Sequence, residues 1–176
     1  TIFGAVFEST LNPETRRSGG MHYTSIENIH KVIDPLFLDE LKIDLESFKE
    51  DIKNTAQEKR QKKKLKQFQE KLASIEFLDP AAGSGNFLTE TYLSLRRIEN
   101  EAIETVSGGQ MEIATEFINP IKVSIAQFHG IEINDFAVTV ARTALWIAES
   151  QMMAETEEII HANLDFLPLK TQANIV

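Results

Sequence analysis

Ile75-Glu76-Phe77-Leu78-Asp79-Pro80-Ala81-Ala82-Gly83-Ser84-Gly85 joins a short apolar run to a loop of small residues. The apolar run, residues 75–78, predicts a β-strand, and the glycine-containing loop, residues 79–85, predicts a tight turn after it. Apolar residues then recur at intervals of three and four, which predicts a helix. They are Leu88, Tyr92, Leu95 and Ile98. A strand, a glycine loop and a helix in this order are typical of a parallel α/β sheet.

A second unit of the same kind follows. Residues 128–133 are the next strand candidate, and Asn134 is a good N-cap for the apolar, helix-spaced residues after it. The run Asn174-Ile175-Val176 predicts the start of a third strand. We therefore expect residues 75–176 to form a parallel sheet with connecting helices, in a protein of the α/β class.

Residues 1–74 are predicted to be helical. Thr24 followed by Glu27 forms a capping-box pattern, so a helix should begin there, and Pro35 should end or kink it. The segment 36–72 has no glycine or proline and is rich in Lys, Glu, Gln and Leu, which favours one or two long exposed helices. We expect this helical part to form one structural unit with the sheet.

The composition limits the possible classes of function. The chain has 176 residues, 42% of them hydrophobic, which is enough to bury one core. It has no cysteine and its four histidines are far apart, so we expect no metal site. No apolar run approaches the roughly 20 residues that cross a bilayer, and no signal pattern is visible. We expect a cytoplasmic protein without membrane contact.

The charge is unevenly distributed along the chain. With 18 basic and 27 acidic residues the net charge is −9, whereas a domain that grips DNA usually has a basic face. Residues 49–72 differ, with nine Lys or Arg and four Asp or Glu. They form either the solvated face of a surface helix or an arm that contacts phosphates. We expect this chain alone to bind DNA weakly or not at all.

Two glycines and one carboxylate mark a candidate binding site. In open α/β sheets, ligands bind where strand ends and a helix N-terminus converge, which is the position of residues 79–85. Gly83 and Gly85 would let a ligand lie against backbone, although a plain tight turn has the same composition. Glu132 can accept hydrogen bonds from two ribose hydroxyls, or it can be a charge at the start of the next helix. A phosphate loop is less favoured, because no Gly-Lys-Ser/Thr is present.

Three motifs resemble those of the amino-methyltransferases that act on DNA adenine. Residues 79–88 are similar to motif I, usually DPACGSGxFL, with Ala82 at the common cysteine position. Gly130-Ile131-Glu132-Ile133-Asn134 resembles the motif II strand, and Gly20-Met21-His22-Tyr23-Thr24-Ser25 resembles motif X. A narrower similarity, to the MmeI-like restriction-modification enzymes, involves residues 3–17 and 35–38.

The resemblance implies S-adenosyl-L-methionine as the cofactor and a partial Rossmann-like methyltransferase sheet. Asp79 would contact the methionine amino group, Glu132 the ribose, and Ile133 the adenine ring. The backbone of Ala81, Gly83 and Gly85 would lie under the cofactor. Tyr23 and Thr24 of motif X would close the methionine side, and Asn86 and Phe87 would line the edge of the pocket.

The family motif that holds the target base is missing. The NPPY or NPPF sequence that holds a flipped adenine does not occur in the 176 residues. The resemblance implies a parent enzyme that methylates adenine N6 in DNA within a restriction-modification system, and we expect no catalytic residue and no activity in this chain alone. Two alternatives stay open: a methyltransferase of the same fold that acts on RNA or protein, and a helical interaction module without a cofactor.

Overall fold

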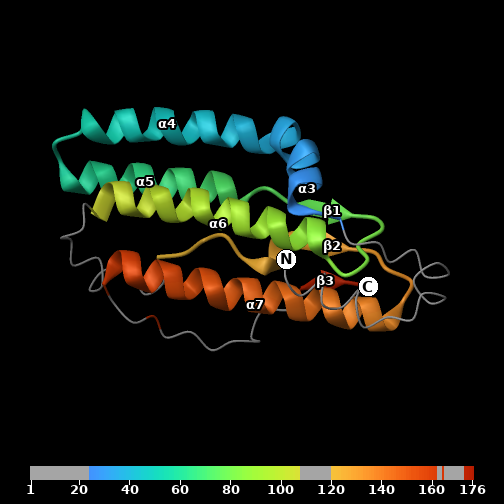
Figure 1. The fold of residues 1–176 in the computed structure, drawn as a ribbon. Helices are drawn as coiled ribbons and strands as arrows, with labels where there is room; N and C mark the ends of the chain where they lie inside the picture. The colour runs from blue at the N-terminus through green and yellow to red at the C-terminus, as the bar shows by residue number, and fades with distance from the viewer. Residues whose placement is uncertain (1–23, 108–119, 162–163, 165–172) are drawn as a thin grey trace.

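The computed structural model describes residues 24–107, 120–161, 164 and 173–176. Within them, a three-stranded parallel sheet has the order β1-β2-β3 (Figure 1). The strands are β1, Phe77–Asp79; β2, Phe128–Gly130; and β3, Asn174–Ile175. All three lie where the sequence predicted strands, although β2 ends at Gly130 rather than near residue 133. Glu132 therefore lies just beyond the end of its strand.

Two long helices connect the strands. Helix α6, Asn86–Ser107, leaves the glycine loop after β1, and helix α7, Asp135–Ile160, follows β2. Asn134 caps α7 as predicted, because its side chain accepts hydrogen bonds from the amides of Phe136 and Ala137. α6 and α7 pack against each other, and a short 3-10 helix, Ile125–Gln127, precedes β2.

Within residues 24–74 the N-terminal part is helical, as predicted, and residues 1–23 of that prediction lie outside the described part of the chain. Helix α3, Ile26–Ile33, passes through a π-helical segment, η1, Asp34–Leu38, into helix α4, Asp39–Lys53. Pro35 is at the start of η1, and Figure 1 shows α3 and α4 running in different directions on either side of it. Helix α5, Glu58–Ala73, then runs beside α4. The predicted Thr24 cap is wrong: Ser25 is the N-cap, because its hydroxyl accepts from the Asn28 amide at 3.4 Å.

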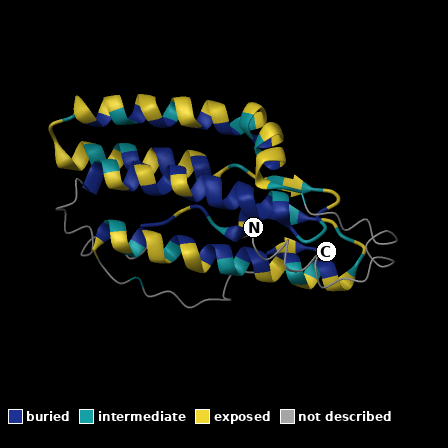
Figure 2. Cartoon of the chain, in the orientation of Figure 1, coloured by how far each residue is buried: buried dark blue, intermediate teal, exposed yellow. Residues whose placement is uncertain are grey.

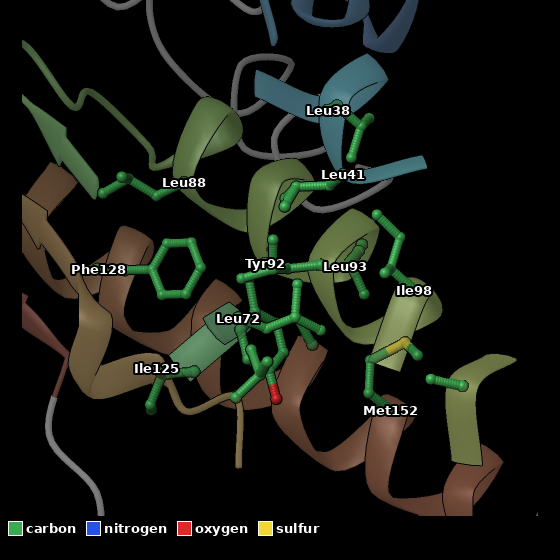
Figure 3. Close-up of a cluster of buried hydrophobic side chains, with 14 of the residues drawn as sticks. Leu38, Leu41, Leu72, Leu88, Tyr92, Leu93, Ile98, Ile125, Phe128 and Met152 are labelled. Atoms are coloured by element: carbon green, nitrogen blue, oxygen red, sulfur yellow. The ribbon is translucent and has the colours of Figure 1, made fainter. Parts of the chain in front are cut away.

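Helix α6 is at the centre of the core. It contacts α3, α4, α5 and α7, and it is buried along nearly its whole length (Figure 2). Figure 3 shows Leu88 and Tyr92 beside Phe128 of β2, whose ring meets the Tyr92 ring edge-on at 5.5 Å. One apolar cluster contains side chains of both the helical part and the sheet part. The two parts are therefore packed on a common core.

The basic stretch, residues 49–72, is largely neutralised by neighbouring carboxylates. Six of its nine cationic side chains form ion pairs, two of them with α4 residues that face α5: Lys64 with Asp51, and Lys71 with Asp44. Within the described part of the chain, the other three have no ion pair; they are Lys59, Arg60 and Lys63. This arrangement favours a solvated helix face over a phosphate-binding arm.

None of the helices formed by the described residues is long and apolar enough to cross a membrane. The same residues contain no group of three or more His, Asp or Glu side chains that could hold a metal ion.

Candidate cofactor site

The glycine loop is held against the chain that leaves β2. The Ile131 amide donates to the Asp79 carbonyl at 2.9 Å, and the Ala82 amide donates to the Ile131 carbonyl at 3.0 Å. The loop then closes on itself, because the Gly85 amide donates to the Ala82 carbonyl at 2.8 Å. These backbone hydrogen bonds place the loop, the start of α6 and Glu132 together at the carboxyl ends of β1 and β2.

Gly83 and Gly85 have similar backbone conformations and different surroundings. Both have positive φ angles, +54° and +75°, which residues other than glycine rarely adopt. A Cβ on Gly85 would lie 2.8 Å from the Ala141 Cβ of α7, whereas a Cβ on Gly83 would meet nothing within 4 Å. Gly85 thus allows close packing of the loop on α7. Gly83 leaves open space beside the loop backbone, and we call this space the cradle of Gly83.

The carboxylate of Glu132 is fixed by two backbone amides. The Gly83 amide donates to Oε2 and the Asn134 amide donates to Oε1, each at 2.8 Å. The carboxylate therefore spans the cradle of the glycine loop and the start of α7. A carboxylate has about four lone-pair positions, so each oxygen can still accept a further hydrogen bond.

Ile133 follows Glu132 and has an almost fully exposed apolar side chain, 97% of its surface being accessible. Phe136, two residues into α7, is also more than half exposed. Two large apolar side chains next to a fixed carboxylate give this edge a surface on which a flat ring can pack.

A pocket of about 250 Å³ lies beside the first residues of the loop. Asp79, Pro80 and Phe87 line it from the loop and the start of α6. α3 and η1 form another part of its wall, and the remaining residues come from β1 and α6. The full lining is Val32, Ile33, Leu36, Phe37, Phe77, Leu78, Asp79, Pro80, Phe87, Leu88 and Thr91.

The expected site residues differ in their surroundings. Asp79 lines the pocket while its Oδ1 accepts from the Ala81 amide at 3.0 Å. Asn86 is buried, and Ala81 is exposed. Thr24 is half-buried before α3, and Tyr23 lies outside the described residues. The cofactor contacts expected of these residues stay predictions.

The α3 and η1 wall of the pocket was not identified from the sequence. Val32, Leu36 and Phe37 looked like ordinary helix residues, and only their contact with the loop reveals a shared pocket. The available signal was Pro35, which interrupts the helix and marks η1 as irregular.

A buried polar network supports the strand that leads to Glu132. Glu99 of α6 is fully buried and forms an ion pair with Arg96. Its carboxylate also accepts from the Lys122 amide at 2.6 Å and from Gln69 of α5 at 2.8 Å. Arg96 donates to the Thr156 hydroxyl of α7 at 2.7 Å. The network thus fastens three helices to the segment just before β2.

Comparisons with known proteins agree with this geometry. The structure of the Type IIL restriction-modification enzyme MmeI in complex with DNA is similar to this chain, with a TM-score of 0.84 and 38% sequence identity. The similarity covers 99% of this chain and 22% of that one. The parallel sheet and its glycine loop therefore form a partial methyltransferase-like α/β fold.

The chain belongs to the family described as MmeI, DNA-methyltransferase domain, whose model matches residues 54–176. DNA methyltransferase A of Bacillus subtilis (strain 168) is 42% identical over 175 residues, which is 99% of this chain and 18% of that protein. The chain spans about a fifth of the length of these two relatives. The predicted relationship to MmeI-like restriction-modification enzymes is thereby confirmed.

Proposed function

We propose that this chain is the S-adenosyl-L-methionine-binding part of a site-specific DNA adenine-N6 methyltransferase of a restriction-modification system. The observation that carries the proposal is the fixed carboxylate of Glu132 beside the open cradle of Gly83. Two free acceptor positions on a held carboxylate suit the paired hydroxyls of a ribose. Because the side chain is already ordered, ligand binding costs little of its rotational freedom.

The other parts of the cofactor fit the surroundings of Glu132. Ile133 offers an exposed apolar surface to an adenine ring, and Asp79 has its second carboxylate oxygen available for an ammonium group in the pocket. When bound, S-adenosyl-L-methionine supplies the methyl group that is transferred. The residues of this chain bind and orient it, which is a positioning contribution to catalysis. The proposal includes a Rossmann-like sheet, to which residues 75–176 contribute three strands and against which the helices of residues 26–73 pack.

DNA as the substrate is supported by the relatives. MmeI was solved in complex with DNA, and the Bacillus subtilis protein is named a DNA methyltransferase. Adenine as the target base rests on the resemblance of residues 79–88 to motif I of the adenine enzymes. We place the parent enzyme in the cytoplasm, where its DNA substrate lies, and we expect this chain alone to bind DNA weakly.

Calorimetric titration of the purified chain with S-adenosyl-L-methionine tests the cofactor site. We expect saturable binding that weakens at least about tenfold in Glu132→Ala and in Asp79→Ala, because each loses hydrogen bonds to a charged group. Glu58→Ala is the matched control, since Glu58 is an exposed carboxylate in α5 paired only with Lys62 in the described structure. A folded wild-type chain that does not bind, or a Glu132→Ala variant that binds normally, contradicts the proposal.

The lack of activity of the isolated chain is tested separately. Incubation with DNA and labelled S-adenosyl-L-methionine should leave adenine unmodified, because no NPPY or NPPF sequence is present to hold a flipped base. Methylated adenine above the level of a no-protein control would show that this chain holds its own base-binding residues.

A further inference from the structure

His30 joins helix α3 to helix α6 through two carboxylates. Its Nδ1 lies 2.8 Å from Oδ1 of Asp34, at the start of η1, and its Nε2 lies 3.2 Å from Oε1 of Glu90. Glu90 is in the second turn of α6, shortly after the glycine loop, and only 3% of it is exposed. The imidazole is thus a bridge between two helices that are far apart in the sequence.

The chemistry of the bridge favours the protonated imidazole. An ionised carboxylate only accepts hydrogen bonds, and a neutral imidazole carries a single N–H, so only the imidazolium can donate to both partners. The hydrogen bond to Asp34 raises the pKa of His30, with a further contribution from Glu90, against the opposing effect of desolvation. The same contact with His30 lowers the pKa of Asp34.

Two further charged groups lie against this bridge in the described structure. Arg97 of α6 lies 3.4 Å from the Glu90 carboxylate, and Lys42 of α4 lies 3.7 Å from the Asp34 carboxylate. Both cationic side chains are about half exposed. If His30 loses its proton, one of the two carboxylates loses its imidazole donor and keeps only a screened partner.

The bridge is beside the pocket that extends from the glycine loop. Val32 and Leu36, on either side of Asp34, line the pocket on the α3 and η1 side. Thr91, the neighbour of Glu90, lines it on the α6 side, and Asp79 faces it from the loop. Because both α3 and α6 contribute lining residues, the spacing between these helices affects the width of the pocket.

We propose that His30 is a positioning residue that holds α3 and η1 against α6 and so fixes the part of the pocket wall that α3 and η1 form. When the bridge opens, the pocket loosens and the methionine end of S-adenosyl-L-methionine binds more weakly. This inference rests on the proposed function, because it assigns the pocket to one end of that cofactor.

The first part of the test measures the bridge itself. A titration of the histidine ring signals by nuclear magnetic resonance should give His30 a pKa above about 6.5 in the wild-type chain. Glu90→Gln should lower this pKa, because it replaces an ionised acceptor by a neutral amide. A pKa at or below that value in the wild type, or one unchanged in Glu90→Gln, would overturn the bridge.

The second part measures cofactor affinity by calorimetry at about pH 6 and about pH 8.5. We expect wild-type affinity to fall about fivefold at the higher pH, and we expect His30→Gln to be weak at both, with little pH dependence. His129→Gln is the matched control, because His129 also pairs with a carboxylate, that of Glu76, but outside the pocket. Comparing ratios between variants removes any effect of pH on the ligand.

The outcomes separate the two proposals. Equal affinities and equal pH ratios in wild type and His30→Gln would overturn the positioning role while leaving the cofactor site intact. A folded wild-type chain that binds no S-adenosyl-L-methionine at either pH would overturn the proposed function together with this role. If thermal unfolding shows that His30→Gln is not folded, Asp34→Asn replaces it, since it weakens the bridge from its more exposed end.

Discussion

The start of helix α6 and its middle are surrounded differently. The start follows the glycine loop, where a Cβ on Gly83 would meet nothing within 4 Å and the Gly83 amide donates to the half-buried carboxylate of Glu132. The middle, around Arg96 and Glu99, is enclosed by α5, α7 and the segment before β2. The comparison shows that the loop before one end of a helix can stay open to a ligand while the charged groups in the middle of the same helix serve the structure of the chain.

The buried middle should show the largest effect. Removing one partner of a buried ion pair costs about 3–5 kcal/mol, so Glu99→Ala should lower the free energy of unfolding by that amount. Urea denaturation followed by circular dichroism measures it. Glu101→Ala, which removes an exposed carboxylate of the same helix paired with Lys49, should cost less than about 1 kcal/mol. Equal losses of unfolding free energy in Glu99→Ala and Glu101→Ala would show that the burial of Glu99 does not increase its contribution to stability.

A double variant sharpens the interpretation of that loss. Arg96→Met combined with Glu99→Leu removes both buried charges and fills the space with apolar atoms, so much of the stability lost in Glu99→Ala should return. A double variant as unstable as the single one would show that the backbone hydrogen bonds from Lys122 and Val123 to Glu99 matter more than the ion pair.

Gly85→Ala should have the next largest effect. The new Cβ would lie 2.8 Å from the Cβ of Ala141 and 3.1 Å from its Cα, and the φ angle of +75° disfavours any side chain. Overpacking and strain together should cost about 3 kcal/mol in the free energy of unfolding, measured by the same denaturation. Adding Ala141→Gly should recover part of the loss. No recovery would mean that strain at Gly85, and not contact with α7, explains the cost.

Gly83→Ala should affect stability less and ligand binding more. The cradle has room for a Cβ, so the cost to folding is the φ angle of +54° alone, about 1 kcal/mol. The added methyl group would occupy the space assigned to the cofactor, so S-adenosyl-L-methionine affinity should fall in a folded protein. Calorimetry and thermal unfolding of the same sample measure both. Unchanged affinity would mean that the cradle is not part of the cofactor site.

The smallest expected effect is the pH dependence contributed by His30. Since the pKa of His30 is raised in the folded chain, its contribution is fully present below about pH 6.5 and is lost as the pH rises through the folded-state pKa. We expect a loss of about 1 kcal/mol or less, because the ring is partly exposed. Thermal unfolding of wild type and His30→Gln, at a pH below about 6.5 and at a pH above the folded-state pKa of His30, measures this loss of stability. Taking the difference between the two proteins removes the contributions of other titrating groups.

Local sequence patterns predicted much of the fold, because helix starts and strand–loop–helix units have short-range causes. The side-chain oxygen of Asn134 caps α7 through amides only two and three residues ahead, so its role could be predicted from the local sequence. Thr24 and Ser25 are both good caps, and the sequence alone does not decide between them. In the structure Ser25 is the N-cap of α3. The positions of Gly83 and Glu132 in one site followed from the order of the elements, and the structure brings them into contact.

The charged clusters could not be predicted from the sequence. Arg96 and Glu99 are three residues apart in a helix, the usual spacing of an exposed ion pair, and their burial depends on helices and loops far along the chain. His30 and Asp34 also have ordinary helical spacing. Only the packing of α3 on α6 brings Glu90 to the imidazole. Long-range packing therefore determined which of these polar groups became structural.

Glu132 also takes part in the pairing of β3. Its amide donates to the Val176 carbonyl at 2.7 Å, and the Val176 amide donates to the Gly130 carbonyl at 2.9 Å. A ligand that holds the Glu132 side chain also restrains these two hydrogen bonds, so it should suppress local opening of the strand. Amide hydrogen–deuterium exchange at Val176 would then slow in proportion to ligand occupancy. Exchange next to β3 would thus measure binding at Glu132, although no side chain of β3 belongs to that proposed site.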